Sequence, residues 1–232
     1  MMDFDLLFPN RESQAKAAAV LESLPKLDWE IFFENKKQDV TGTIHPSCVV
    51  AEDVGVGEGS EVGPFCVIEK NVSIGKNCVI RSHVLLREGT VIGDDVVIGH
   101  GTEVKHSFVF DRAKIGSHAF VGDSIVGYGA RIGTGVVTGN RRFDQQPVHW
   151  HLEIGNAPAL RDKVGCLIGD FVRLGANVTT NPGTIIGAYT WISGGQGVNG
   201  FIPPKMFLKP DGALVANEQA GDLDSVDRQG AL

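Results

Sequence analysis

Aliphatic residues recur at every sixth position along much of the chain. Each sixth residue from Ile44 to Val104 is isoleucine, valine or leucine, and Phe110 extends the run. An α-helix repeats near every 3.6 residues and a strand at every second residue, so neither alone produces this period. A short strand followed by a tight turn does. We therefore expect a solenoid in which each hexad forms one side of a triangular prism and three hexads complete one coil.

Two further positions of the hexad predict how the coils pack. Glycine often follows the aliphatic residue, as at Gly75 and Gly93, and we expect it to supply the positive φ of a tight turn. The residue four positions after the aliphatic one is expected to point inward and to be small. All four cysteines occupy that position: Cys48, Cys66, Cys78 and Cys166. We therefore predict that the four thiols are reduced, buried and fill space in the core. Their spacing matches no zinc-binding pattern.

The repeat is interrupted in three places. The step shortens to five residues after Phe110 and again after Val121. The pattern then breaks across residues 140–163 and resumes at Ile168. Because a long polar insertion is rarely needed to stabilise a solenoid, we expect an external loop that carries a binding function.

The segments before and after the repeat predict a cap and a tail. The expected domains are a helical or irregular cap over residues 1–43, the β-helix over residues 44–210 and a C-terminal tail over residues 211–232. Within the cap, residues 13–24 have the composition of a short helix, with Asn10 or Ser13 as its N-cap. We expect Trp29 and Phe32 to cover the open end of the prism, as repeat arrays require.

Composition and charge narrow the classes of partner. The chain of 232 residues has a formal net charge of −7. An acidic chain is a poor ligand for nucleic acid or for an anionic membrane, since both attract dense lysine and arginine. No apolar stretch is long enough to span a membrane, and the first residues lack an export signal. We therefore expect a cytoplasmic protein that binds neither nucleic acid nor membrane.

Four motifs occur in order between residues 86 and 140: LREG, TEVKHS, HAFVGDS and RIGTGVVTGN. Together they resemble the acetyltransferase domain of glucosamine-1-phosphate acetyltransferases, including the archaeal sugar-1-phosphate nucleotidylyltransferase/acetyltransferases, and stand-alone UDP-N-acetylglucosamine pyrophosphorylase-related proteins. The resemblance covers residues 44–210. It implies an all-β fold, the left-handed parallel β-helix of hexapeptide-repeat acyltransferases. It also implies acetyl-CoA as acyl donor, no tightly bound cofactor and a homotrimer.

The resemblance assigns roles to six residues. In this family a histidine takes the proton from the attacking amine of an amino-sugar-1-phosphate, and basic residues hold the sugar phosphate. His118 is the candidate catalytic base, since histidine accepts a proton near neutral pH. The candidate substrate-binding residues are Arg87, Lys105, Phe120, Asn140 and Arg142. Arg87 and Lys105 taken singly also fit solvated charges at the corners of the prism, and Arg142 fits either a phosphate contact or a loop charge.

The chain departs from the family pattern at the base itself. The family reads His-x-x-Tyr-x-Gly-Asp, and here Ser117 stands at the histidine and Phe120 at the tyrosine. His118 comes one residue later, and in an extended segment such a shift turns a side chain to the other face. Gln146 and His149 replace lysines of the archaeal branch, which removes positive charge from the insertion.

Two functions therefore remain open. The first is an acetyl-CoA-dependent N-acetyltransferase that acts on an amino-sugar-1-phosphate or a related sugar nucleotide. The second is a catalytically altered sugar-nucleotide-binding or scaffold protein of the same fold. We do not expect nucleotidyl transfer from this chain, because that reaction needs a glycine-rich loop in a separate α/β domain. His149 and His151 lack a third ligand for a metal, and Ser117 lacks a catalytic partner.

Exposed apolar residues give a physical reason for the implied homotrimer. We expect Val84, Leu85 and Val97 to lie on prism faces, where a second copy would remove them from water. The small-molecule partner implied by the resemblance is a sugar phosphate.

Overall fold

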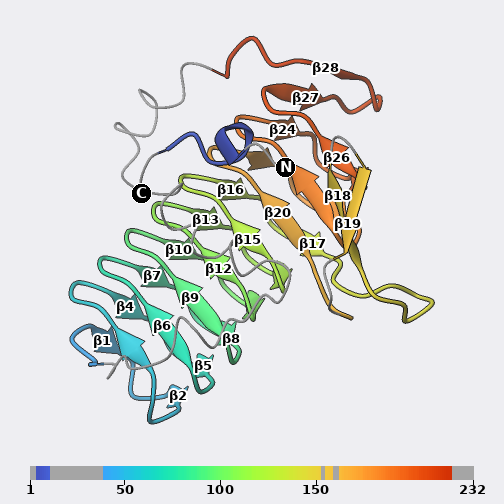
Figure 1. Ribbon diagram of the computed structural model, residues 1–232. Helices are drawn as coiled ribbons and strands as arrows, with labels where there is room; N and C mark the ends of the chain where they lie inside the picture. Colours follow the sequence, from blue (N-terminus) through green and yellow to red (C-terminus); the bar gives the residue numbers. More distant parts are fainter. Residues whose placement is uncertain (1–3, 11–38, 153–154, 159–161, 221–232) are drawn as a thin grey trace.

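The computed structural model describes residues 4–10, 39–152, 155–158 and 162–220. The expected helix over residues 13–24, together with Trp29 and Phe32, lies outside these ranges. Within them the chain coils around one axis, and short parallel strands form three sheets around a common core (Figure 1). The predicted all-β, left-handed parallel β-helix is confirmed. No described helix is long and apolar enough to cross a membrane.

The three sheets correspond to the three faces of the prism. Sheet A contains β3 (Gly55–Val56), β6 (Val72–Ile74), β9 (Thr90–Ile92), β12 (Phe108–Val109), β15 (Ile125–Val126), β20 (Cys166–Ile168), β23 (Thr184–Ile186) and β26 (Phe201–Ile202). Sheet B contains β1 (Thr43–Ile44), β4 (Glu61–Val62), β7 (Val79–Ile80), β10 (Val97–Ile98), β13 (Lys114–Ile115), β16 (Arg131–Ile132), β21 (Arg173–Leu174), β24 (Trp191–Ile192), β27 (Met206–Leu208) and the antiparallel β28 (Leu214–Ala216). Sheet C contains β2 (Val49–Val50), β5 (Val67–Ile68), β8 (Leu85–Leu86), β11 (Glu103–Lys105), β14 (Phe120–Gly122), β17 (Val137–Thr138), β22 (Thr179–Thr180) and β25 (Gly197–Val198).

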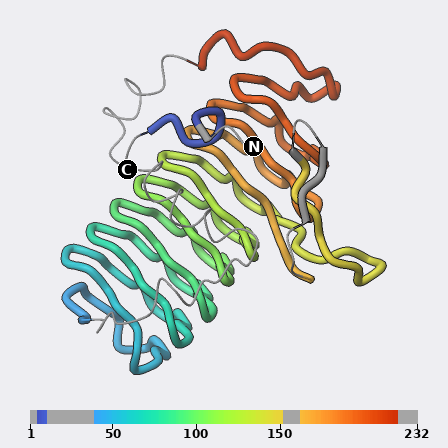
Figure 2. Tube along the Cα trace, viewed as in Figure 1, coloured from blue at the N-terminus to red at the C-terminus, as the bar shows by residue number. Residues whose placement is uncertain are grey.

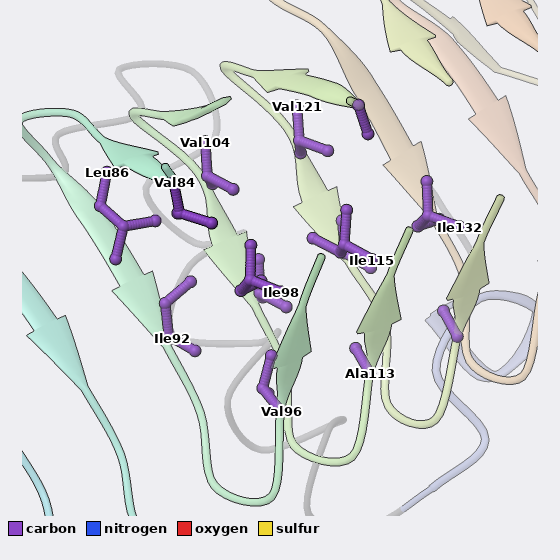
Figure 3. Close-up of a cluster of buried hydrophobic side chains, with 14 of the residues drawn as sticks. Val84, Leu86, Ile92, Val96, Ile98, Val104, Ala113, Ile115, Val121 and Ile132 are labelled. Atoms are coloured by element: carbon purple, nitrogen blue, oxygen red, sulfur yellow. The ribbon is translucent and has the colours of Figure 1, made fainter. Parts of the chain in front are cut away.

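The aliphatic residues of the hexads stack inside the prism, as the period of six predicts. Ile98 pairs in register with Ile80 on the coil before it and with Ile115 on the coil after it. Figure 3 shows these layers pointing toward one another between the strands. Each fully buried side chain of this kind contributes about 1.5–3 kcal/mol through the hydrophobic effect, so the column is the main source of stability.

The cysteines occupy the small inward positions that the pattern assigned to them. All four are free, Cys48 is half-buried, and the other three are buried. Burial raises the pKa of the Cys66 and Cys78 thiols, so both stay protonated and apolar in character at neutral pH. Val84, which we expected on a prism face, is likewise a core residue with 1% of its surface exposed.

The first short step of the repeat lies one residue earlier than the sequence indicated. Val109, not Phe110, enters the core, because β12 pairs with β9 and sets Val109 against Ile92. Phe110 therefore points outward, where its ring lies 5.7 Å from that of Phe8. The two five-residue steps thus run from Val104 to Val109 and from Val121 to Val126.

The glycines after the aliphatic positions serve close packing and do not supply a positive φ. A Cβ on Gly99 would lie 2.5 Å from the carbonyl carbon of Gly116 on the next coil, which leaves no room for a side chain. The left-handed backbone occurs two residues further on, as at Gly101 (φ 65°) and His118 (φ 55°). Asparagine, aspartate and histidine tolerate this conformation better than other side chains, and they hold many of these positions.

A second apolar layer covers part of the outer face of sheet A. The short helix η1 (Phe4–Leu6) leads into Leu7 and Phe8, which are buried there. The Leu7 carbonyl accepts a hydrogen bond from the backbone amide of Asp170, so the start of the chain lies against late coils (Figure 2). The insertion forms a hairpin of β18 (His149–Leu152) and β19 (Gly155–Pro158), and its Trp150 is buried in the same layer.

Candidate functional site

The two corners that border sheet C hold the histidines of interest. We call the turn that enters a sheet C strand the B–C corner and the turn that leaves it the C–A corner. His118 lies at the B–C corner, just before β14. His106 and Asp123 lie at the C–A corner, just after β11 and β14. The outer face of sheet C lies between the two corners.

Four rings form a column along the B–C corner, which we call the histidine column: Phe65, His83, His100 and His118. Successive ring centroids lie 5.1, 5.2 and 5.1 Å apart. The ring of His118 packs over Gly101, where a Cβ would come within 2.7 Å of its Nδ1. The side chain of His118 is exposed. The one-residue shift seen in the sequence therefore places His118 in an aromatic stack on the surface.

A different arrangement occupies the C–A corner, which we call the Asp123 cluster: Lys105, His106, Asp123 and Asn140. Lys105 Nζ lies 3.3 Å from Asp123 Oδ2, and Asn140 Nδ2 donates to the same oxygen at 2.6 Å. His106 Nδ1 lies 3.2 Å from Asp123 Oδ1. The Asp123 side chain is 7% exposed, whereas those of Lys105 and His106 are 19% and 21% exposed. A buried carboxylate thus joins three partners that face solvent in part.

The shortened steps of the repeat build this cluster. Strand β11 pairs with β14 so that Lys105 stands opposite Gly122, which sets His106 beside Asp123 on the next coil. Both corners are one residue shorter than a regular corner, and both residues adopt a left-handed backbone, with φ of 48° and 49°. The next coil places Asn140 at the same corner, where the insertion begins. The interruptions of the period therefore mark the cluster in the sequence.

The charge of Asp123 determines which ring nitrogen of His106 carries a proton. Burial alone would raise the pKa of this carboxyl, but the hydrogen bond from His106, the charge of Lys105 and the hydrogen bond from Asn140 lower it below its usual value. An ionised carboxylate only accepts hydrogen bonds, so Nδ1 of His106 carries the proton. The neutral imidazole then holds its lone pair on Nε2.

Arg87 lies on the outer face beside the cluster. Its backbone amide donates to Val104 of the next coil. Its Nη1 donates to Glu103 Oε1 at 3.1 Å, and its Nε lies 3.8 Å from Glu69 Oε1. Two carboxylates therefore hold the guanidinium in place and offset part of its charge.

Phe120 connects the outer face to the cluster. Its ring packs over Gly122, where a Cβ would come within 2.7 Å of the ring and 3.0 Å of Asn140 Nδ2. Gly122 thus allows the ring of Phe120 and the amide of Asn140 to lie next to each other. This brings an apolar surface to the edge of the polar cluster.

The insertion leaves the prism at the same corner. The carbonyl of Asn140 accepts a hydrogen bond from Val164, and the amide of Gly165 donates to the carbonyl of Asp123, so the base of the loop is closed beside the cluster. Arg142 stands on the exposed part of the loop, where its Nε donates to Asp144 Oδ1 at 2.8 Å. That pairing raises the pKa of Arg142 and lowers the pKa of Asp144 to about 2.

The structure brings together four of the six residues assigned from the sequence. Lys105 and Asn140 meet on Asp123, and Phe120 and Arg87 lie beside them. His118 stands at the opposite corner, about 16 Å of extended chain away at about 3.3 Å per residue. Arg142 stands on the loop and contacts Asp144.

Sequence reasoning missed three members of this region. No sequence motif assigns a role to Asp123, His106 or Glu103. The five-residue steps were the signal, because they mark the corners at which His106 and Asp123 come together. Among the described residues, no group of three histidine, cysteine or acidic side chains is placed to hold a metal ion.

Comparisons with known proteins agree with this architecture. A model of the GMPPB C-terminal domain matches residues 88–191, and a model of the bacterial transferase hexapeptide repeat matches residues 53–88. The first match contains the histidine column in part and the whole Asp123 cluster.

Curated relatives share sequence with the same region. The bifunctional protein GlmU of Methanococcus aeolicus is 30% identical over 75% of this chain and 42% of its own length. The bifunctional sugar-1-phosphate nucleotidylyltransferase/acetyltransferase of Sulfurisphaera tokodaii is 39% identical over 38% of this chain and 22% of its own length. The putative uncharacterized acetyltransferase YaiX of Escherichia coli is 42% identical over 34% of each chain. The chain thus spans less than half the length of these relatives.

Among solved structures, the UDP-N-acetylglucosamine O-acyltransferase of Moraxella catarrhalis has a TM-score of 0.49 and 16% identity, covering 82% of this chain and 78% of that chain. The hexapeptide matches, the curated relatives and the three-sided parallel coil together confirm the resemblance that the motifs carried. The chain is similar in sequence to bacterial transferases with hexapeptide repeats and to these bifunctional acetyltransferases.

Proposed function

We propose that the protein is an acetyl-CoA-dependent N-acetyltransferase that acts on an amino-sugar-1-phosphate or a related sugar nucleotide. One observation carries the proposal: Arg87, Lys105, Phe120 and Asn140, which the family resemblance assigns to substrate, gather on one face and one edge of sheet C. They come from different coils and from positions up to 53 residues apart.

The side chains suit an amino sugar that carries phosphate. Arg87 and Lys105 are cations beside an open face, and a guanidinium can hold phosphate oxygens with two hydrogen bonds. Phe120 offers an apolar surface for the face of a sugar ring, and Asn140 offers an amide beside it. Arg142, on the loop that leaves the same corner, is proposed as a further phosphate contact that would exchange Asp144 for the ligand.

The reaction requires a base that takes a proton from the acceptor amine. The sequence proposes His118 for this role, and His118 borders the same face of sheet C at the B–C corner. His106 borders it at the C–A corner. The two histidines are therefore rival candidates within one proposed activity.

We propose that the working unit is a homotrimer in the cytoplasm. Apolar side chains on the outer face of sheet C support association: Val49, Val67 and Val137 are 66%, 39% and 39% exposed. Val49 and Val67 are adjacent in register on β2 and β5, and monomeric proteins rarely leave contiguous apolar surface uncovered. Four free cysteines support a reducing compartment. Light scattering of the purified chain measures the number of copies directly.

Release of CoA tests the activity. Purified protein is incubated with acetyl-CoA and either glucosamine-1-phosphate, galactosamine-1-phosphate or the corresponding sugar nucleotide, and free thiol is measured with time. We expect turnover with at least one acceptor and a strong loss in Arg87→Ala. Arg81→Ala is the matched control, because Arg81 is an exposed arginine on the B–C corner, at the other edge of sheet C from Lys105 and Asn140. An absence of turnover with every acceptor would contradict the proposal.

The second candidate function is a binding or scaffold protein of the same fold. The pairing of Arg87 with Glu103 and of Lys105 with Asp123 favours it, since both cations already have carboxylate partners. Calorimetry distinguishes the two functions: binding of a sugar nucleotide without CoA release supports the second.

A further inference from the structure

We propose that His106, held by Asp123, is the catalytic base of this site, in place of the histidine that the family carries one coil later. The inference rests on the proposed acetyl transfer and deepens it. It assigns a catalytic role to His106 and a positioning role to Asp123.

The first argument is the state of the imidazole. Asp123 is buried and ionised, so it accepts the proton of His106 Nδ1 and keeps the lone pair on Nε2. A base needs this fixed tautomer, and it needs a negative charge nearby when the imidazole gains its second proton. Asp123 supplies both through one contact of 3.2 Å.

The second argument is the position of the ring. His106 packs over Gly89, where a Cβ would come within 2.5 Å of its Cδ2, so the absent side chain of Gly89 leaves space for the imidazole. Contacts with Gly89 and Asp123 orient the ring from two sides. Even so, 21% of the side chain remains exposed, which leaves it within reach of a ligand.

The third argument is the set of residues that surround His106. Lys105 is its neighbour in the chain and shares Asp123 with it, and Asn140 binds the same carboxylate. The residues proposed to bind the acceptor therefore meet at the carboxylate that orients His106. The ring contacts of His118, in contrast, are with the surface column at the far corner.

In the proposed reaction, the acetyl group moves from the thioester sulfur to the acceptor nitrogen. The lone pair of the acceptor amine attacks the carbonyl carbon of the acetyl thioester, and a C–N bond forms. Nε2 of His106 takes one proton from the nitrogen, and Asp123 stabilises the resulting imidazolium. The C–S bond then breaks, and the imidazolium returns its proton to the departing sulfur. The products are the N-acetyl sugar and CoA with a free thiol.

Three asparagine variants test the assignment, since asparagine tolerates the left-handed backbone that all three positions adopt. His106→Asn, His118→Asn and the control His83→Asn are compared by CoA release. We expect kcat to fall roughly 100-fold in His106→Asn, because general base catalysis contributes at least that factor. We expect the control His83→Asn to stay close to the wild type and His118→Asn to lose far less activity than His106→Asn.

The positioning role of Asp123 has its own readout. Nitrogen-15 spectra of the histidine side chains are expected to show the Nδ1–H tautomer at His106 in the wild type and a loss of that tautomer in Asp123→Asn. A role in folding alone leaves the tautomer ratio of a variant that remains folded unchanged.

The outcomes separate the two proposals. Loss of activity in His118→Asn with His106→Asn still active overturns the inference and leaves the proposed acetyl transfer intact. A wild-type protein without CoA release for any acceptor overturns the proposed function and the inference with it. A His106 ring that is not in the Nδ1–H form overturns the inference whatever the activity.

Discussion

The two corners that border sheet C hold the same residue type in the same backbone conformation, yet they differ in chemistry. His118 and His106 both adopt a left-handed φ, at 55° and 48°. His118 stacks on another imidazole at the surface, whereas His106 contacts a carboxylate that is 7% exposed. The environment around the ring, and not the presence of histidine, is the reason why we propose the C–A corner for proton transfer.

The difference arises from the length of the turn. Corners of the B–C type keep the regular repeat, and their rings point outward in a column. Phe65, His83 and His118 adopt a left-handed φ, whereas His100 comes one residue before the left-handed Gly101. Two consecutive C–A corners are one residue shorter, and this brings His106, Asp123 and Asn140 onto successive coils at one edge. A break in a solenoid repeat is thus a place to search for function.

The largest difference in stability between the two corners is expected when the carboxylate of Asp123 is removed. Asp123→Ala leaves Lys105 and Asn140 without their shared acceptor and is expected to lower the free energy of unfolding by about 2 kcal/mol. Urea titration followed by circular dichroism measures this. The same substitution in an exposed carboxylate, Glu58→Ala, is the control and is expected to change little. Equal effects in the two variants would contradict a special role for the corner.

A smaller effect is expected on substrate binding. Arg87→Ala is expected to raise KM for a phosphorylated acceptor roughly tenfold, because a hydrogen bond to a charged group contributes about 1.5 kcal/mol. Steady-state kinetics with Arg81→Ala alongside checks this. Unchanged KM in Arg87→Ala would remove this arginine from the proposed phosphate site.

The dependence of stability on pH also distinguishes the C–A corner from the B–C corner. The native pKa of Asp123 lies below its unfolded value, so its contribution is complete above about pH 4 and is lost as the pH falls through the native pKa. Between pH 6 and pH 3 the wild type is therefore expected to lose more stability than Asp123→Asn. Unfolding curves at the two pH values give the difference, and parallel losses would show that Asp123 does not titrate in this range.

The smallest effect is expected at the histidine column. His118→Asn removes one edge-to-face ring contact at the surface, which contributes at most about 1 kcal/mol. Thermal unfolding is expected to show a small decrease in Tm. A large decrease would mean that the column stabilises the coils as much as the Asp123 cluster does.

Much of the fold could be predicted from the sequence because the period of six is a direct consequence of the geometry. An inward aliphatic residue such as Ile98 must meet its counterparts on adjacent coils, and each must be apolar. The pattern could not tell Val109 from Phe110, since both are apolar and adjacent. Strand pairing with Ile92 and the outer layer around Phe8 decided between them.

The candidate site was harder to predict from the sequence than the fold. The motifs placed Lys105 and Asn140 correctly in one region, because their spacing follows the coil. They did not indicate Asp123 as the common partner, since a contact across a shortened corner depends on where the step shortens. The role of His118 was transferred from the family across a one-residue shift, and that shift moves the side chain into the column.

The most direct test of the account is a double-mutant cycle on His106 and Asp123, with kcat/KM for CoA release measured in the wild type, in His106→Asn, in Asp123→Asn and in the double variant. If the two residues act as a unit, the double variant is expected to be no slower than His106→Asn alone. Losses that simply multiply would contradict the account, because they would mean that the histidine and the carboxylate act independently.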